Sequence, residues 1–121
     1  MNSHPLATTL AHAIAERAPE RLGAQLSDTV RLRALLPGGE LERTGREAVV
    51  AQFADWFGDF GTVVLDDVAG DTVGDRVLVH YKLLVDRRGD RRVVTQTVVC
   101  GVADGQVRRM DLVCSGFREL S

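Results

Sequence analysis

The chain has 121 residues, of which 45% are hydrophobic and 26% are charged. These values are ordinary for one globular domain and exclude a disordered or fibrous chain, and the length is too short for two cores. With 15 basic and 17 acidic residues the net charge is −2, so the molecule has no overall field that would gather nucleic acid or anionic lipid. We expect a single domain over residues 1–121 with neither nucleic acid nor a membrane as its partner.

Two features of the sequence bear on its location. The start of the chain has no basic segment followed by an apolar run, and no apolar run approaches the roughly 20 residues of a membrane span. The two cysteines, Cys100 and Cys114, match no zinc-binding spacing, and the strand register given below puts them on opposite faces of a sheet. We therefore expect free thiols, no metal site and a reducing, cytoplasmic compartment.

The first quarter of the chain predicts two helices. Pro5 suits a first helical turn, and apolar residues then recur at three- and four-residue steps, at Leu6, Leu10, Ala13 and Ile14. This pattern predicts a helix over residues 5–18 that Pro19 ends. A second, short helix then begins at Pro19, with Leu22 and Leu26 on one face.

A strand and a third helix follow. Residues 29–36 alternate apolar and basic side chains, which is typical of a half-buried strand, and the Pro-Gly-Gly of residues 37–39 predicts a turn. Thr44 and Glu47 have the spacing of a capping box, which predicts a helix over residues 45–58. Its apolar stripe contains most of the aromatic mass of the protein: Val49, Phe53, Trp56, Phe57 and, just beyond, Phe60.

The rest of the chain has the pattern of strands, over residues 62–68, 75–87, 90–103 and 106–117. Helices followed by long antiparallel strands predict an α+β fold with the helices on one side of one sheet. Long, strongly twisted strands curl around the helices that cover them. We therefore expect a curved antiparallel sheet wrapped around the helices, forming a cone with an internal pocket.

Two hairpin turns set the predicted register. Asp104-Gly105 and Arg88-Gly89 both suit tight turns that need positive φ. Counting back from these turns pairs Tyr81 with Gln96 and Val98 with Asp111. The interior face is then aliphatic apart from four polar side chains, Tyr81, Gln96, Arg109 and Asp111, which is the composition of a lined pocket. A one-residue bulge would invert this assignment.

The order of these elements, together with the stretches LSDTVRLRALLPGG, TGREAVVAQFADWF and DGQV…CSGF, resembles the nuclear transport factor 2-like superfamily. The resemblance covers nearly the whole chain, and it implies the cystatin-like cone fold of SnoaL-like proteins. This superfamily includes isomerases, dehydratases, polyketide cyclases, epoxide hydrolases and plain binding domains, so the fold specifies no activity. Its enzymes typically work without a cofactor, and the resemblance implies none here. Residues 33–36, which match the position of the ketosteroid isomerase base, contain no acid, so that chemistry is not carried over.

Six residues form the predicted site. Asp111 is the predicted general base, because a carboxylate in an apolar cone has its pKa raised by desolvation, and Tyr81 or Gln96 is the predicted oxyanion donor. The predicted ligand-binding residues are Phe53, Trp56, Gln96 and Arg109. The alternative for Asp111 is a buried pair with Gln96 or Arg109 that only stabilises the sheet.

Three functions remain open at this point. The first is a homodimer, paired through its sheet, in which each cone binds a small hydrophobic molecule in a mainly apolar pocket. The second is a cofactor-independent acid/base enzyme of the isomerase, dehydratase or polyketide cyclase kind, acting on a hydrophobic substrate. The third is a dimerisation module whose cone is filled by its own side chains.

Overall fold

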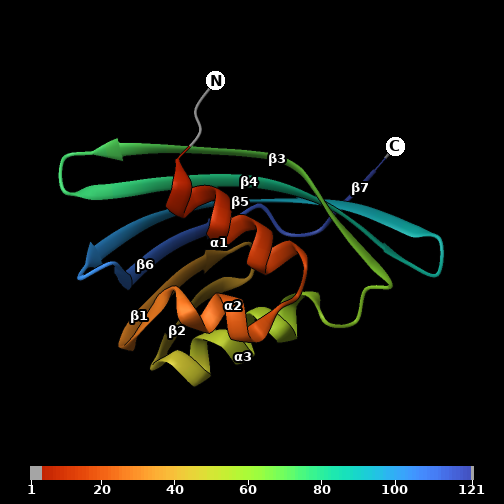
Figure 1. Ribbon diagram of the computed structural model, residues 1–121. Coiled ribbons are helices and arrows are strands. Elements are labelled where there is room, and N and C mark those ends of the chain that lie inside the picture. Colours follow the sequence, from red (N-terminus) through yellow and green to blue (C-terminus); the bar gives the residue numbers. More distant parts are fainter. Residues whose placement is uncertain (1–3, 121) are drawn as a thin grey trace.

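The computed structural model describes residues 4–120, which form three helices and seven strands. In chain order they are α1 (Pro5–Ala15), α2 (Pro19–Ala24), β1 (Leu26–Leu36), β2 (Gly39–Thr44), α3 (Arg46–Phe57), β3 (Thr62–Val73), β4 (Arg76–Arg87), β5 (Asp90–Ala103), β6 (Gln106–Cys114) and β7 (Arg118–Glu119). Figure 1 shows the helices gathered against one face of a curved sheet. The predicted α+β class and the curved sheet are confirmed.

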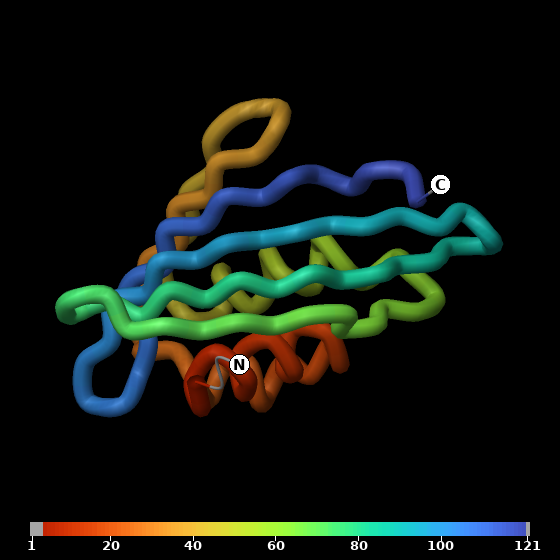
Figure 2. The backbone as a smooth tube through the Cα atoms, turned by 90° about the horizontal axis from the view of Figure 1, so that it is seen from above, coloured from red at the N-terminus to blue at the C-terminus, as the bar shows by residue number. Residues whose placement is uncertain are grey.

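The strands form one open sheet in the order β2-β1-β6-β5-β4-β3, with β7 paired to β5. The pairing of β1 with β6 is parallel, whereas the neighbouring pairs are antiparallel. Seen from above in Figure 2, the long strands β4 and β5 run over α3, α1 and α2 lie along the β3 side, and the β1–β2 hairpin projects past β6 on the opposite side. The concave face therefore holds the core, and the convex face is open to solvent.

The helices differ from the prediction in length and in capping. Helix α1 ends at Ala15, and Arg17 adopts a positive φ of 53° in the turn before α2. The capping box is wrong: Gly45 is the N-cap of α3, and it makes no side-chain cap hydrogen bond. The reason is that Thr44 closes β2, a strand the prediction lacks, where it pairs with Arg31.

Both predicted hairpin turns are confirmed. Arg88 and Gly89 have φ values of 56° and 86°, and Asp104 and Gly105 have values of 54° and 75°, as tight turns of this kind require. The predicted register between β4 and β5 is also confirmed, with Tyr81 opposite Gln96. These two strands therefore present the interior face that was expected.

The register of β6 differs from the prediction because of a bulge. Val102 pairs with Val107 as expected, but Gly101 pairs with Arg109, so Arg108 is an extra residue in β6. From this point each β6 side chain moves to the opposite face. The interior therefore receives Met110, Leu112 and Cys114 in place of the predicted Arg109, Asp111 and Val113.

The free energy of burying side chains favours the shifted register of β6. Burying a Met or Leu side chain stabilises a protein by about 1.5–3 kcal/mol, whereas burying a carboxylate or guanidinium among apolar side chains costs more than that unless it is paired. Met110 is 0% exposed and Leu112 is 2% exposed. The sequence carried a signal for this bulge, since Arg108 and Arg109 are two consecutive charged residues between the apolar Val107 and Met110.

The bulge also changes the placement of the cysteines. Cys100 and Cys114 lie on the same face, contrary to the prediction, but both are free as expected. Cys100 pairs with Met110 and Cys114 pairs with Gln96, four residues away along β5. At about 3.3 Å per residue this separation exceeds the reach of a disulfide.

Helix α1 packs closely against β3 at Gly70. A Cβ atom on Gly70 would lie 2.4 Å from the Cβ of Ala7 and 2.7 Å from that of His4. The absence of a side chain at this position therefore brings helix and strand together. Within residues 4–120, no helix combines the length and the apolar character needed to cross a membrane.

We predict that Gly70→Ala lowers the free energy of unfolding by about 1–3 kcal/mol, because the added methyl group must displace α1 from β3. Gly38→Ala is the matched control, since a Cβ there meets no atom within 4 Å. Urea unfolding of both variants measures the difference. Equal stabilities of the two variants would contradict this packing.

Candidate functional site

The interior of the cone contains a polar chain of three side chains, Tyr81, Gln96 and Cys114. The Tyr81 hydroxyl donates a hydrogen bond to Oε1 of Gln96, and Nε2 of Gln96 donates to Sγ of Cys114 at 3.4 Å. Burial raises the pKa of Tyr81 well above its usual range, with Cys114 and Cys100 as smaller causes. Tyr81 therefore remains a neutral donor at physiological pH, and two of the predicted site residues are in direct contact.

This interior is filled by protein. Tyr81 is 0% exposed and Gln96 is 1% exposed, so no water-sized void reaches the Tyr81 side chain. The same holds for its apolar neighbours on the concave face, Val79, Leu83, Val94, Val98 and Met110. The pocket that the sequence predicted around Tyr81 and Gln96 is thus occupied by the core itself.

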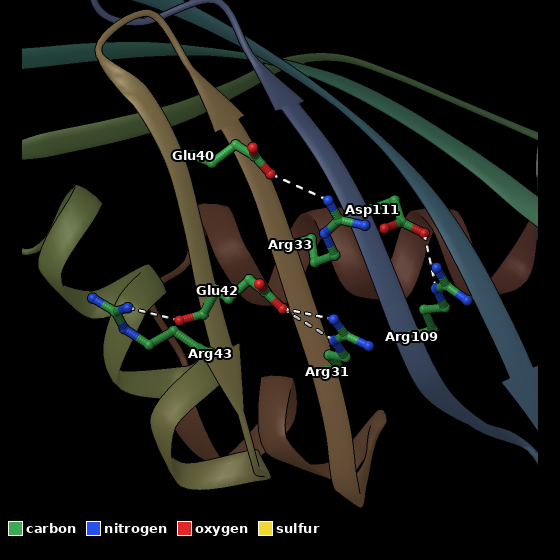
Figure 3. Close-up of polar contacts among 7 residues, drawn as sticks. All are labelled: Arg31, Arg33, Glu40, Glu42, Arg43, Arg109 and Asp111. Atoms are coloured by element: carbon green, nitrogen blue, oxygen red, sulfur yellow. Dashed lines mark hydrogen bonds and ion pairs between the residues drawn. The ribbon is translucent and has the colours of Figure 1, made fainter.

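The predicted base, Asp111, lies outside this interior. Figure 3 shows Asp111 and Arg109 on the outer face of β6, where Nε of Arg109 lies 3.1 Å from Oδ2 of Asp111. Their side chains are 41% and 49% exposed, so the expectation that they line the pocket is wrong. The bulge at Arg108 is the reason, because it turns both side chains away from the core.

Asp111 and Arg109 border a row of ion pairs across β1 and β2 (Figure 3). Arg31 bonds to Glu42, and Arg33 bonds to Glu40. The hydrogen bond from Arg31 lowers the pKa of Glu42, and the hydrogen bond to Glu40 raises the pKa of Arg33. These side chains lie on the solvent-exposed outer face of the sheet, so Asp111 is one of several surface charges there.

No ionisable base replaces Asp111 inside. Among the described residues, the buried amide side chains Gln52 and Gln96 take up no proton near neutral pH, and burial raises the pKa of the buried Tyr81 and Cys100, so both keep their protons there. Residues 4–120 also contain no group of three or more His, Cys, Asp or Glu side chains placed to hold a metal ion. The interior polar chain can orient a hydrogen-bonding group, but it holds no general base.

The aromatic residues of α3 form a packed cluster. Phe53 and Trp56 meet edge to face with ring centroids 5.1 Å apart, and Phe57 packs against Phe117 at 6.0 Å. Phe53 and Phe57 are buried, and Trp56 is half-buried. Of the two predicted ligand-binding aromatics, Phe53 lines an open cleft and Trp56 does not.

An apolar cleft lies between the three helices, on the side of α3 that faces α1 and α2. It has a volume of about 170 Å³. We call it the helix cleft and define it by its lining: Ala13, Ile14, Arg17, Ala18, Pro19, Leu22, Val50, Phe53, Ala54 and Gly58. Arg17 is the one charged residue in this lining. The sequence prediction missed the cleft apart from Phe53, because local patterns assign the helices but do not show how the three helices pack against one another.

Comparison with known proteins agrees with this fold. The model of the SnoaL-like domain family matches residues 7–110. The chain belongs to this family. No curated protein matches this SnoaL-like chain. The predicted resemblance to the nuclear transport factor 2-like superfamily is therefore confirmed.

Solved structures share the SnoaL-like fold at low sequence identity. A protein of ketosteroid isomerase-like fold from Catenulispora acidiphila, in complex with trimethylamine, has a TM-score of 0.75 and 16% identity, covering 95% of this chain and 88% of that one. A candidate ketosteroid isomerase from Kribbella flavida has a TM-score of 0.67 and 25% identity, covering 96% of this chain and 79% of that one. A candidate polyketide cyclase from Xanthomonas campestris has a TM-score of 0.70 and 22% identity, covering 89% of this chain and 86% of that one. These likenesses establish the fold, and the chemistry must be argued from this chain's own residues.

The buried Tyr81 and Cys100 predict a loss of stability at alkaline pH. Burial raises the pKa of Cys100 to about 12 from 9.0, with Asp111 as a smaller cause, and it also raises the pKa of Tyr81. The unfolded chain therefore releases these protons at lower pH than the folded chain does. The stability that the neutral groups provide is complete below about pH 9 and is lost as the pH rises towards the folded pKa values.

We expect the unfolding free energy, measured in urea between pH 9 and pH 11, to depend less steeply on pH in Cys100→Ala and in Tyr81→Phe than in the wild type. The difference in slope should correspond to up to about one proton fewer released on unfolding. Val98→Ala is the control, because it removes buried methyl groups from the same face without removing a titrating group. This variant should lose stability at every pH with the slope of the wild type. An unchanged slope in both Cys100→Ala and Tyr81→Phe would show that these groups ionise freely in the folded protein.

Proposed function

We propose that this SnoaL-like protein binds a small, mainly apolar organic molecule in the helix cleft. The observation that carries the proposal is the cleft itself, an apolar depression of about 170 Å³ that is open on one side. An apolar cavity of roughly 150 Å³ is large enough to hold benzene. The ligand is therefore a molecule of about that size, or a larger one with one apolar end in the cleft.

The lining gives such a ligand apolar contacts on several sides. Ile14 comes from α1, Leu22 from α2, and Val50 and Phe53 from α3. Because these side chains belong to three packed helices, the site is formed before the ligand arrives and little ordering energy is lost on binding. For a ligand of about eight heavy atoms, the expected dissociation constant lies roughly between micromolar and millimolar.

The comparison with the Catenulispora protein supports a small organic ligand. That protein was solved with trimethylamine, and it shares this fold over 95% of the present chain. The interior polar chain is less suited to ligand binding, because Tyr81 and Gln96 already satisfy each other and no water-sized void reaches Tyr81. The helix cleft is open without any rearrangement.

We predict that Ala54→Phe weakens ligand binding by filling the cleft. Ala54 is exposed and lines the cleft, so a larger side chain there occupies the site without entering the core. Benzyl alcohol is the probe, and saturable amide shifts at Val50, Ala54 and Gly58 measure its binding by NMR. We expect the affinity to fall at least tenfold in Ala54→Phe.

Thr9→Phe is the matched control for Ala54→Phe. Thr9 is exposed on α1 and lies outside the cleft lining, so this variant should bind benzyl alcohol as the wild type does. The proposal is wrong if benzyl alcohol produces no saturable shifts in the cleft of the wild type. It is also wrong if Ala54→Phe binds the probe unchanged.

We propose in addition that two copies pair through the outer face of the sheet, in the cytoplasm as expected for a chain with free thiols. Leu35 and Val113 are paired neighbours on β1 and β6, and they are 54% and 56% exposed. The next pair on the same face, two residues along each strand, is Arg33 and Asp111, so apolar and oppositely charged side chains lie side by side. In a dimer, Arg33 of one copy could pair with Asp111 of the other.

We predict that Val113→Lys shifts the protein from dimer to monomer, because each copy would bring a new positive charge into an apolar contact. Val73→Lys is the control, since Val73 is equally exposed, at 57%, but lies at the far end of β3. Sedimentation velocity measures both variants. A wild type that is monomeric at high micromolar concentration would rule out this pairing.

A further inference from the structure

We infer that the ligand of the helix cleft is a carboxylate, with its apolar body in the cleft and its carboxylate on the guanidinium of Arg17. This inference rests on the proposed function, since it concerns the same cleft. Its basis is a cation that lines an apolar cleft and has no carboxylate partner among the described residues.

Arg17 is held in place by its backbone and by its guanidinium. Its positive φ of 53° turns the chain sharply after α1. The guanidinium crosses to the end of α3, where Nη1 donates to the carbonyl oxygens of Phe60 at 2.5 Å and Phe57 at 3.5 Å, and Nη2 donates to that of Gly61 at 3.3 Å. The charge therefore has a defined position beside the lining residues Phe53 and Gly58.

The guanidinium keeps donors for a ligand. Within the part of the chain that the structure describes, Nε of Arg17 has no acceptor, and Nη2 uses one of its N–H groups. No carboxylate of residues 4–120 lies within ion-pair distance of Arg17. The adjacent Glu16 bonds to Arg21 and approaches His12 at 3.5 Å.

These features favour an anionic headgroup such as a carboxylate over neutral and cationic headgroups of similar size. A carboxylate accepts two N–H donors of a guanidinium in one plane, and such charge-assisted bonds are about twice as strong as neutral ones. An amide offers a weaker acceptor, and an amine would bring a second positive charge beside Arg17. The rest of the lining is apolar, so the body of the ligand must be apolar too.

The experiment compares three ligands of one shape: benzoate, benzamide and benzylamine, titrated calorimetrically at pH 7 and low salt. We expect benzoate to bind about tenfold more tightly than benzamide, and benzylamine to bind most weakly. In Arg17→Gln the benzoate affinity should fall about tenfold, while the benzamide affinity stays within about twofold. Arg17→Lys should retain part of the preference, because it keeps the charge and loses the planar fork.

Arg21→Gln is the matched control, because it removes the same charge four residues away, outside the cleft lining. It should leave all three affinities unchanged. The ratio of benzoate to benzamide affinity within one protein is unaffected by a general loss of stability. If Arg17→Gln does not fold, the inference is tested by the ratio of benzoate to benzamide affinity in the wild type and in Arg17→Lys, which should be smaller in Arg17→Lys.

The inference is overturned if the wild type binds benzoate and benzamide equally. It is also overturned if Arg17→Gln weakens both ligands by the same factor, which would mean that Arg17 only caps the end of α3. These results differ from a failure of the proposed function, in which none of the three ligands binds and Ala54→Phe changes nothing.

Discussion

The bulge at Arg108 sets the chemistry of both faces of the sheet. A single extra residue in β6 exchanges the side chains of the two faces from that point on. The interior gains Met110 and Leu112, and the convex face gains the Arg109–Asp111 pair. The apolar core beneath α1 and α3 and the charged outer surface beside β1 both depend on this one irregularity.

The interior that results is dry and closely packed, with Tyr81 and Gln96 as a mutually satisfied polar pair. Removing either partner would leave a buried polar group without a hydrogen bond, which costs about 1–3 kcal/mol. Such a pair fixes the relative positions of β4 and β5, because a shifted register would separate the two side chains. In this conformation the pair links β4 to β5, and its residue types are also those of a binding pocket.

The open apolar surface lies instead between the helices. The turn after α1 places Arg17 across the end of α3, so the same side chain joins two helices and lines the helix cleft. A rigid frame with one fixed cation and an apolar floor is a simple arrangement for recognising a molecule with a charged end and an apolar body.

The sequence by itself determined the elements whose signals are local. The strand alternation, the two positive-φ turns and the β4–β5 register follow from neighbouring residues, and so does the Tyr81–Gln96 contact. Only the tertiary structure decided the face of Asp111 and the existence of the helix cleft. Asp111 depends on how β6 docks between β1 and β5, and the cleft depends on how three helices pack. Burial against distant residues chose between registers that local patterns leave nearly equal.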